Sequence, residues 1–134
     1  MQKKVLILCT GNSCRSIIAE ALINAQLEGI TAESSGVKAS GKVNVNAQKL
    51  LEQKGIWKKE YHSKTLDKVI DNAYDLVVTV CDHAKEACPM FPKKVQVLHV
   101  GFEDPDGKGF EAFEEIYNQI EEKLLPEVQR ALGV

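Results

Sequence analysis

The strongest chemical signal in the sequence is a run of seven residues that begins with a cysteine and ends with an arginine. The run reads Cys-Thr-Gly-Asn-Ser-Cys-Arg and occupies residues 9–15. The short apolar stretch 4–8 precedes it and predicts a buried strand, and the apolar spacing of residues 16–27 predicts a helix. The two cysteines could be a redox pair, metal ligands or core residues, or one of them could be a nucleophile over an anion site.

A strand, a tight loop and a helix N-terminus together favour the anion site. Gly11 and Asn12 tolerate left-handed backbone angles, which allow such a loop to turn its N–H groups inward. The helix dipole adds positive potential, and Arg15 can hold a tetrahedral oxyanion with paired hydrogen bonds. The same field favours the thiolate form of Cys9. We therefore predict that Cys9 is a nucleophile beneath a phosphate-like ion and that Ser16 hydrogen-bonds its thiolate.

The other predicted elements place this loop at the edge of a sheet. Further strands are predicted at 30–34, 76–80 and 95–100, and further helices at 45–54, 66–73 and 110–132. Strands that alternate with helices indicate a parallel sheet covered on both faces, here in one domain over residues 1–134. Ligands on such sheets bind beyond the carboxyl ends of the strands. The loops found there carry reactive side chains and span residues 9–15, 81–92 and 101–109.

Composition excludes several classes of function. The 134 residues carry a net charge of −2, which does not imply the basic face that nucleic-acid binding requires. No stretch reaches the roughly 20 apolar residues of a membrane span, and the apolar run near the N-terminus is too short for a signal peptide. We therefore expect a cytoplasmic protein without nucleic-acid or membrane partners. In that compartment, four cysteines indicate chemistry or metal binding rather than structural disulfides.

The motif at residues 9–16, followed by Ala19 and Glu20, resembles the phosphate loop of the low-molecular-weight protein tyrosine phosphatases and of the thioredoxin-coupled arsenate reductases that share their fold. The resemblance covers essentially the whole chain. It implies a three-layer α/β/α domain with a four-stranded parallel sheet in the order 2-1-3-4. In that order, Cys9 and Cys81 end neighbouring strands and lie within reach of one another. The resemblance assigns oxyanion binding to Thr10, Gly11, Asn12, Ser13, Cys14 and Arg15.

A second pair of cysteines distinguishes the two activities. Cys81 and Cys88 are seven positions apart. In a helix their Cα atoms would lie about 10.5 Å apart along the axis, whereas a disulfide needs about 7 Å or less. The pair could therefore close only if the segment unwinds, and Pro89 favours a helix end there. A Cys-x6-Cys-Pro segment resembles the redox segment of the arsenate reductases. Core packing and a zinc site that includes His83 are alternatives, although the spacing fits no familiar zinc motif.

The resemblance implies a relay of three thiols. Cys9 attacks arsenate and forms a covalent adduct, Cys81 attacks Cys9 and releases arsenite, and Cys88 then attacks Cys81. Thioredoxin reduces the resulting Cys81–Cys88 disulfide, and no cofactor is needed. We expect a monomer. The alternatives are a phosphatase that hydrolyses a Cys9 phospho-enzyme and a non-catalytic module that binds an oxyanion or senses redox state.

The third loop supplies a candidate acid. Asp104 stands before Pro105 and matches the general-acid aspartate of the family, which would protonate the leaving oxygen as Cys9 attacks. The phosphatases usually place aromatic residues just after this pair, whereas Asp106 and Gly107 follow it here. This departure weakens the phosphotyrosine interpretation and suits a small inorganic substrate.

No metal site is predicted. Some of the reductases bind potassium beside the phosphate loop through an asparagine, a glutamate, a serine and a further acidic residue. Asn12, Glu20 and Ser35 match the first three of these. Lys64 stands at the fourth position, and its ammonium group could occupy the place of the ion. We therefore expect no dependence on potassium.

Overall fold

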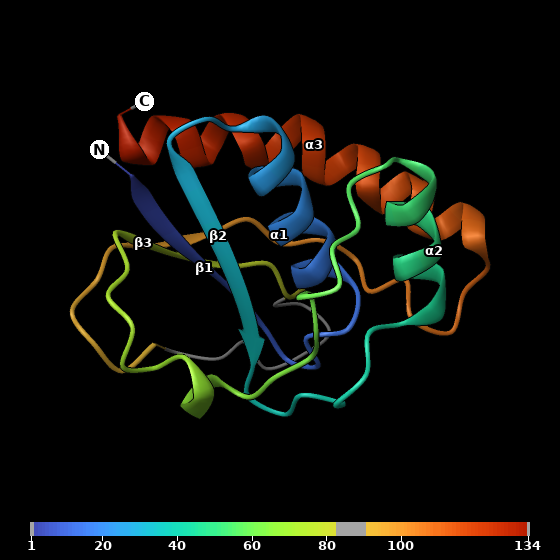
Figure 1. The fold of residues 1–134 in the computed structure, drawn as a ribbon, viewed down its shortest axis with the longest axis horizontal. Coiled ribbons are helices and arrows are strands. Elements are labelled where there is room, and N and C mark those ends of the chain that lie inside the picture. Colours follow the sequence, from blue (N-terminus) through green and yellow to red (C-terminus); the bar gives the residue numbers. More distant parts are fainter. Residues whose placement is uncertain (1, 83–90, 134) are drawn as a thin grey trace.

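The computed structural model describes residues 2–82 and 91–133, which form an α/β fold (Figure 1). In chain order its elements are β1 (Lys3–Cys9), α1 (Arg15–Gln26), β2 (Ile30–Gly36), α2 (Val45–Gln53), the 3-10 turn η1 (Leu66–Lys68), β3 (Leu76–Thr79), β4 (Val97–His99) and α3 (Phe110–Leu132). None of the described helices is long and apolar enough to cross a membrane. Three residues singled out above lie outside the described residues: His83, Cys88 and Pro89.

The strands form one parallel sheet in the order β2-β1-β3-β4, which confirms the expected topology. β1 pairs with β2 along its whole length, up to Cys9 opposite Gly36, and with β3 up to Leu8 opposite Thr79. β2, the next strand in the chain, pairs with one edge of β1, and β3 pairs with its other edge. The switch in strand order therefore falls at the carboxyl end of β1, where ligands bind in folds of this kind.

Side chains of β1 are buried on both faces of the sheet, which explains the uninterrupted apolar run of the sequence. Val5 and Ile7 belong to the main core, to which α1, α2 and α3 contribute. Leu6 and Leu8 point to the opposite face, where they pack with Val69 and Val77 in a smaller cluster. Both faces are covered as predicted, but the longer helices contribute to only one of the two clusters.

Several elements differ from the sequence-based expectation in extent. The helix predicted at 66–73 is only the single turn η1, because its apolar positions Leu66 and Val69 anchor one turn and the residues that follow are largely exposed. β2 runs to Gly36, two residues further than predicted, since its pairing with β1 extends to that point. α3 continues through Pro126, with buried side chains on both sides of the proline.

Candidate active site

Residues 9–15, which we call the anion loop, join the carboxyl end of β1 to the N-terminus of α1. The loop lines a pocket of about 240 Å³ together with Ser16, Ser40, Asp104 and Asp106. The structure thus brings together Cys9, Arg15 and Asp104, the residues that the sequence singled out. A pocket of this size and polar character suits a small oxyanion.

The carbonyl groups of the anion loop are bound by the segment that follows β2. Four backbone N–H groups of residues 37–44 donate to four carbonyls of the loop: Val37 to Cys9 at 3.3 Å, Lys38 to Thr10 at 3.0 Å, Ser40 to Gly11 at 3.0 Å and Asn44 to Ser13 at 2.9 Å. With its carbonyls engaged by this segment, the loop is favoured to turn its own N–H groups towards an anion.

Asn12 fixes the turn of the anion loop. Its φ is 49°, and it is the one residue other than glycine with a positive φ in the described part of the chain. Its side-chain amide donates to the hydroxyls of Ser16 at 2.8 Å and Ser34 at 2.9 Å. Its side-chain oxygen accepts the backbone N–H of Lys64 at 2.9 Å. One side chain therefore joins the loop to α1, to β2 and to the segment before η1.

Arg15 is 4% exposed and is positioned from the loop that carries Asp104. Its guanidinium donates to the carbonyl of Phe102 at 3.0 Å, and its Nη2 lies 3.7 Å from Oδ2 of Asp104. The side chain of Asp104 is half exposed, which leaves it open to the pocket. The backbone N–H of Asp106 donates to its other oxygen at 3.0 Å. Asp104 is thus oriented beside the anion loop, as a general acid must be.

The cysteines of the described residues occupy different chemical states. Cys9 and Cys14 are buried thiols, whereas Cys81 takes part in a disulfide. Burial raises the pKa of Cys14 to about 12, so this thiol stays protonated and unreactive. Cys81 follows β3, and the N–H of Val80 bonds the carbonyl of Leu8 at 3.2 Å. Cys9, the last residue of β1, and Cys81, two residues beyond β3, therefore lie at the carboxyl ends of neighbouring strands, as expected.

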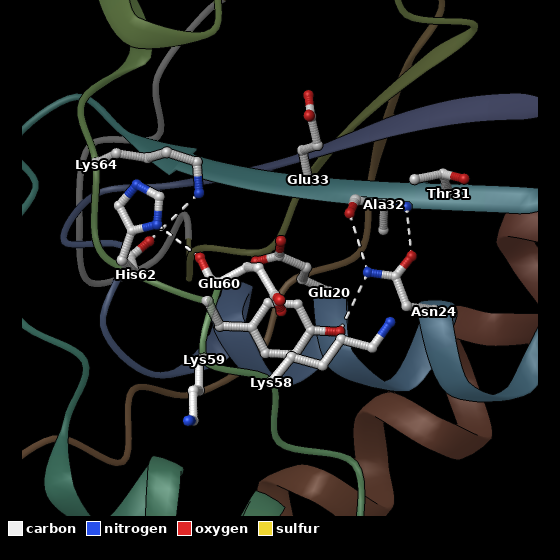
Figure 2. A pocket seen from close by; sticks show the side chains of 11 residues that line it. Glu20, Asn24, Thr31, Ala32, Glu33, Lys58, Lys59, Glu60, His62 and Lys64 are labelled. Atoms are coloured by element: carbon white, nitrogen blue, oxygen red, sulfur yellow. Dashed lines mark hydrogen bonds between the residues drawn. The ribbon is translucent and has the colours of Figure 1, made fainter.

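A larger pocket, of about 670 Å³, is lined by residues of α1, β2 and the segment 58–64 (Figure 2). No cysteine is among the described residues that line it, so the smaller pocket is the candidate active site. Glu20, in the lining of the larger pocket, is connected to the anion loop through Ser34. The hydroxyl of Ser34 donates to Glu20 at 2.6 Å and accepts from Asn12. Burial raises the pKa of Glu20 to about 7, although Ser34 and the charge of Lys64 oppose the shift.

The serine hydroxyl that bonds both Asn12 and Glu20 belongs to Ser34, the neighbour of Ser35 in β2. Successive residues of a strand face opposite sides of the sheet. The hydroxyl of Ser35 is buried without a hydrogen-bond partner. Within residues 2–82 and 91–133, no three histidine, cysteine or acidic side chains cluster as metal ligands would.

Sequence analysis did not assign roles to several residues that support the site. Ser63 donates to the carbonyl of Gly11 at 3.2 Å and accepts the N–H of Gly41 at 3.1 Å. Asn44 caps α2, since its side-chain oxygen accepts the N–H of Asn46 at 2.8 Å. Its position just before a predicted helix is a signal that could have identified the cap. Ser63 carried no local signal because its partners are distant in sequence.

Comparison with known proteins places this geometry in a family. Residues 4–131 match the family described as low molecular weight phosphotyrosine protein phosphatase. The chain belongs to this family. The phosphatase-like fold expected from the anion-loop motif is thereby confirmed.

Similar members of the family include arsenate reductases. The arsenate reductase of Bacillus cereus (strain G9842) is 41% identical over 124 residues, which are 92% of this chain and 92% of that protein. The crystal structure of arsenate reductase from Archaeoglobus fulgidus DSM 4304 superposes with a TM-score of 0.83 at 34% identity, over 92% of this chain and 98% of that one. A thioredoxin-dependent arsenate reductase from Corynebacterium glutamicum gives a TM-score of 0.68 at 28% identity, over 97% of this chain and 63% of that one.

Proposed function

We propose that this protein is an arsenate reductase that uses Cys9, Cys81 and Cys88 in turn and is regenerated by thioredoxin. The observation that carries the proposal is the placement of Cys9 and Cys81 at the carboxyl ends of neighbouring strands, with Cys9 in the anion loop and Cys81 in a disulfide. Cys88 lies outside the described residues, and its place in the relay is proposed from the resemblance of the Cys-x6-Cys-Pro segment to the redox segment of the arsenate reductases. The similarity to arsenate reductases supports the same substrate.

The first step is attack on arsenate held in the anion loop. The thiolate of Cys9 forms a bond to arsenic, and one arsenic–oxygen bond breaks. The departing group is an arsenate hydroxyl, which takes a proton from the Asp104 carboxyl group and leaves as water. Arg15 and the loop N–H groups stabilise the charge of the oxyanion, and the hydroxyl of Ser16 donates a hydrogen bond to the thiolate before it attacks. Arsenic remains pentavalent at this stage.

Reduction occurs in the second step. Cys81, as a thiolate, attacks the sulfur of Cys9, and the electron pair of the sulfur–arsenic bond stays with arsenic. Arsenic becomes trivalent and leaves as arsenite, while the two thiols become a disulfide. Cys88 then attacks Cys81, which restores the Cys9 thiolate and leaves the Cys81–Cys88 disulfide.

Regeneration requires an external dithiol, for which thioredoxin is the proposed donor. The similarity to a thioredoxin-dependent arsenate reductase supports this assignment. Chemistry that begins from three reduced thiols suits a reducing compartment, so we place the reaction in the cytoplasm.

Single-turnover reduction tests the proposal. The protein is reduced, freed of reductant under anaerobic conditions and mixed with arsenate. We expect one arsenite per chain and a disulfide that peptide mass mapping assigns to Cys81 and Cys88. Cys88→Ser should still release arsenite but stop at a Cys9–Cys81 disulfide, and Cys81→Ser should release none. Absence of arsenite, together with intact thiols and steady hydrolysis of an aryl phosphate, would identify the protein as a phosphatase.

A further inference from the structure

Asn44 is bound to three separate parts of the active-site region. Its backbone N–H donates to the carbonyl of Ser13 in the anion loop at 2.9 Å. Its side-chain oxygen caps α2 through Asn46, and its side-chain nitrogen donates to Oδ1 of Asp106 at 2.8 Å. The backbone N–H, the amide oxygen and the amide nitrogen thus each make one of these bonds. The cap alone would explain the oxygen, but it does not explain the bond to Asp106.

Asp106, the acceptor of this bond, is itself hydrogen-bonded to Asp104, the candidate acid. The backbone N–H of Asp106 donates to Oδ1 of Asp104 at 3.0 Å, and Oδ2 of Asp104 lies 3.7 Å from the Arg15 guanidinium. A continuous series of contacts therefore runs from Ser13 through Asn44 and Asp106 to Asp104. It links the loop that binds the oxyanion to the loop that carries the acid, although Asn44 and Asp104 are 60 positions apart in the sequence.

The loop that carries the acid needs such a connection because little of it is buried. Phe102 and Pro105 are buried, whereas Glu103, Asp104 and the residues from Asp106 to Gly109 are exposed. The contact between Arg15 and Asp104, at 3.7 Å, is longer than a hydrogen bond. The bond from Asn44 is a direct hydrogen bond of 2.8 Å. The bond from Arg15 to the carbonyl of Phe102, at 3.0 Å, holds this loop before Asp104, and the bond from Asn44 holds it after Asp104. Asn44 is therefore well placed to help set the position of Asp104.

The bond between Asn44 and Asp106 also fixes the position of a negative charge in the lining of the pocket. Asp106 lines the pocket, and its negative charge and that of Asp104 both act on the Cys14 thiol within the anion loop. A carboxylate that turned inwards would repel a doubly charged oxyanion. By donating to Oδ1, the amide of Asn44 holds the Asp106 carboxylate in a fixed position at the rim.

We propose that Asn44 is a positioning residue that holds Asp106, and through it Asp104, at the distance from the anion loop required for proton transfer to the leaving oxygen. This proposal rests on the function proposed above. Asn44 acts on the step in which the Cys9–arsenic bond forms and water leaves. It contributes little to binding of the oxyanion itself.

Asn44→Ser is the informative variant because serine still caps a helix but is too short to reach Asp106. Asn46→Ser makes the same change two residues away, at a side chain outside this series of contacts, and serves as the matched control. Asp106→Ala removes the acceptor, and the double variant completes a cycle. Inorganic phosphate affinity is measured by calorimetry, and the rate of single-turnover arsenite release is measured with saturating arsenate.

We expect Asn44→Ser to slow arsenite release about 10-fold while phosphate affinity changes by less than about 3-fold. Asp106→Ala should slow the reaction to a similar extent, and the double variant should be no slower than the slower single variant. Asn46→Ser should react at the wild-type rate. An unchanged rate in Asn44→Ser would overturn the proposal, as would losses that multiply in the double variant.

Hydrogen exchange separates this proposal from the proposed function. In Asn44→Ser, the Asp106 amide should exchange faster, while amides inside α2 keep their protection because the cap is retained. If wild-type protein releases no arsenite, the proposed function fails and this measurement decides on Asn44. Unchanged exchange at Asp106 in Asn44→Ser would show that Asn44 does not hold the loop.

Discussion

The side-chain amide of Asn12, in the turn that connects β1 to α1, donates to the hydroxyl of Ser16 in the first turn of α1 at 2.8 Å. Because the oxygen of Ser16 accepts this bond, its own proton remains for another acceptor. The Cys9 thiolate is the acceptor that we propose. The same amide bonds Ser34, which in turn bonds the buried carboxyl of Glu20. The conformation of the anion loop is therefore coupled to the lining of the larger pocket.

Two substitutions of Asn12 separate its backbone role from its side-chain role. Asn12→Gly keeps the positive φ of 49° accessible but removes three hydrogen bonds. Asn12→Ala removes the same bonds and adds about 1 kcal/mol of backbone strain. We expect both variants to bind phosphate more weakly, and Asn12→Ala to be the less stable of the two in urea unfolding. Equal stability of the two variants would contradict a backbone role.

Gly36→Ala should disrupt the anion loop. A Cβ atom at this position would lie 2.4 Å from the carbonyl oxygen of Thr10, a backbone atom that cannot move without the loop. We expect loss of phosphate binding and a destabilisation of about 1–3 kcal/mol, measured by calorimetry and urea unfolding. Gly109→Ala is the control, since its added Cβ meets open space. Full phosphate affinity in Gly36→Ala would show that the loop adapts.

Arg15→Lys should weaken oxyanion binding even though the charge is kept. The buried guanidinium donates to the carbonyl of Phe102 and presents a planar fork, which a lysine cannot reproduce. We expect phosphate affinity to fall about 10- to 100-fold. Arg130→Lys, on the exposed side of α3, is the matched control and should leave affinity unchanged. Wild-type affinity in Arg15→Lys would mean that charge alone holds the ion.

Glu20 should make stability depend on pH. Burial raises its pKa from an ordinary value of 4.5 to about 7, so the folded protein binds more protons than the unfolded chain between these values. Its contribution to stability is therefore fully present below pH 4.5 and is lost as pH rises through about 7. In Glu20→Gln this loss, up to about 3 kcal/mol, should disappear. Urea unfolding at several pH values checks this, with Glu114→Gln, at an exposed position, as the control.

Exchange of sodium for potassium should leave thermal stability and phosphate affinity unchanged. Lys64 lines the pocket beside Glu20, where its charge lowers the pKa of the carboxyl, and its ammonium donates to the carbonyl of His62 at 3.3 Å. A cation is thus already supplied by the chain. Differential scanning fluorimetry at constant ionic strength is the measurement. A melting temperature that rises with potassium and saturates would indicate a bound ion and contradict this expectation.

Local sequence was sufficient for the central part of the fold and site. The apolar run before Cys9 predicted a buried strand, and the helical spacing after Arg15 predicted α1, because each pattern depends only on neighbouring residues. The order of the strands in the sheet was predicted from the family resemblance, which covers the whole chain, and not from any local pattern. The prediction failed at residues 66–73, where only Leu66 and Val69 pack against the core and the residues that follow are largely exposed, so only the turn η1 forms.

The sequence by itself determined which groups are present within one short loop. They are a thiol, an arginine and a turn whose residues tolerate left-handed backbone angles. Their local order already specified an anion site, since a strand end and a helix start place them together. The tertiary structure alone decided what surrounds that loop. Asn44, Ser63 and Ser34 reach it from three separate segments, and Ser34 rather than Ser35 faces Glu20. Such contacts depend on the register of the strands and on how the chain folds back on itself. They join residues that are far apart in the sequence, so no local sequence pattern predicts them.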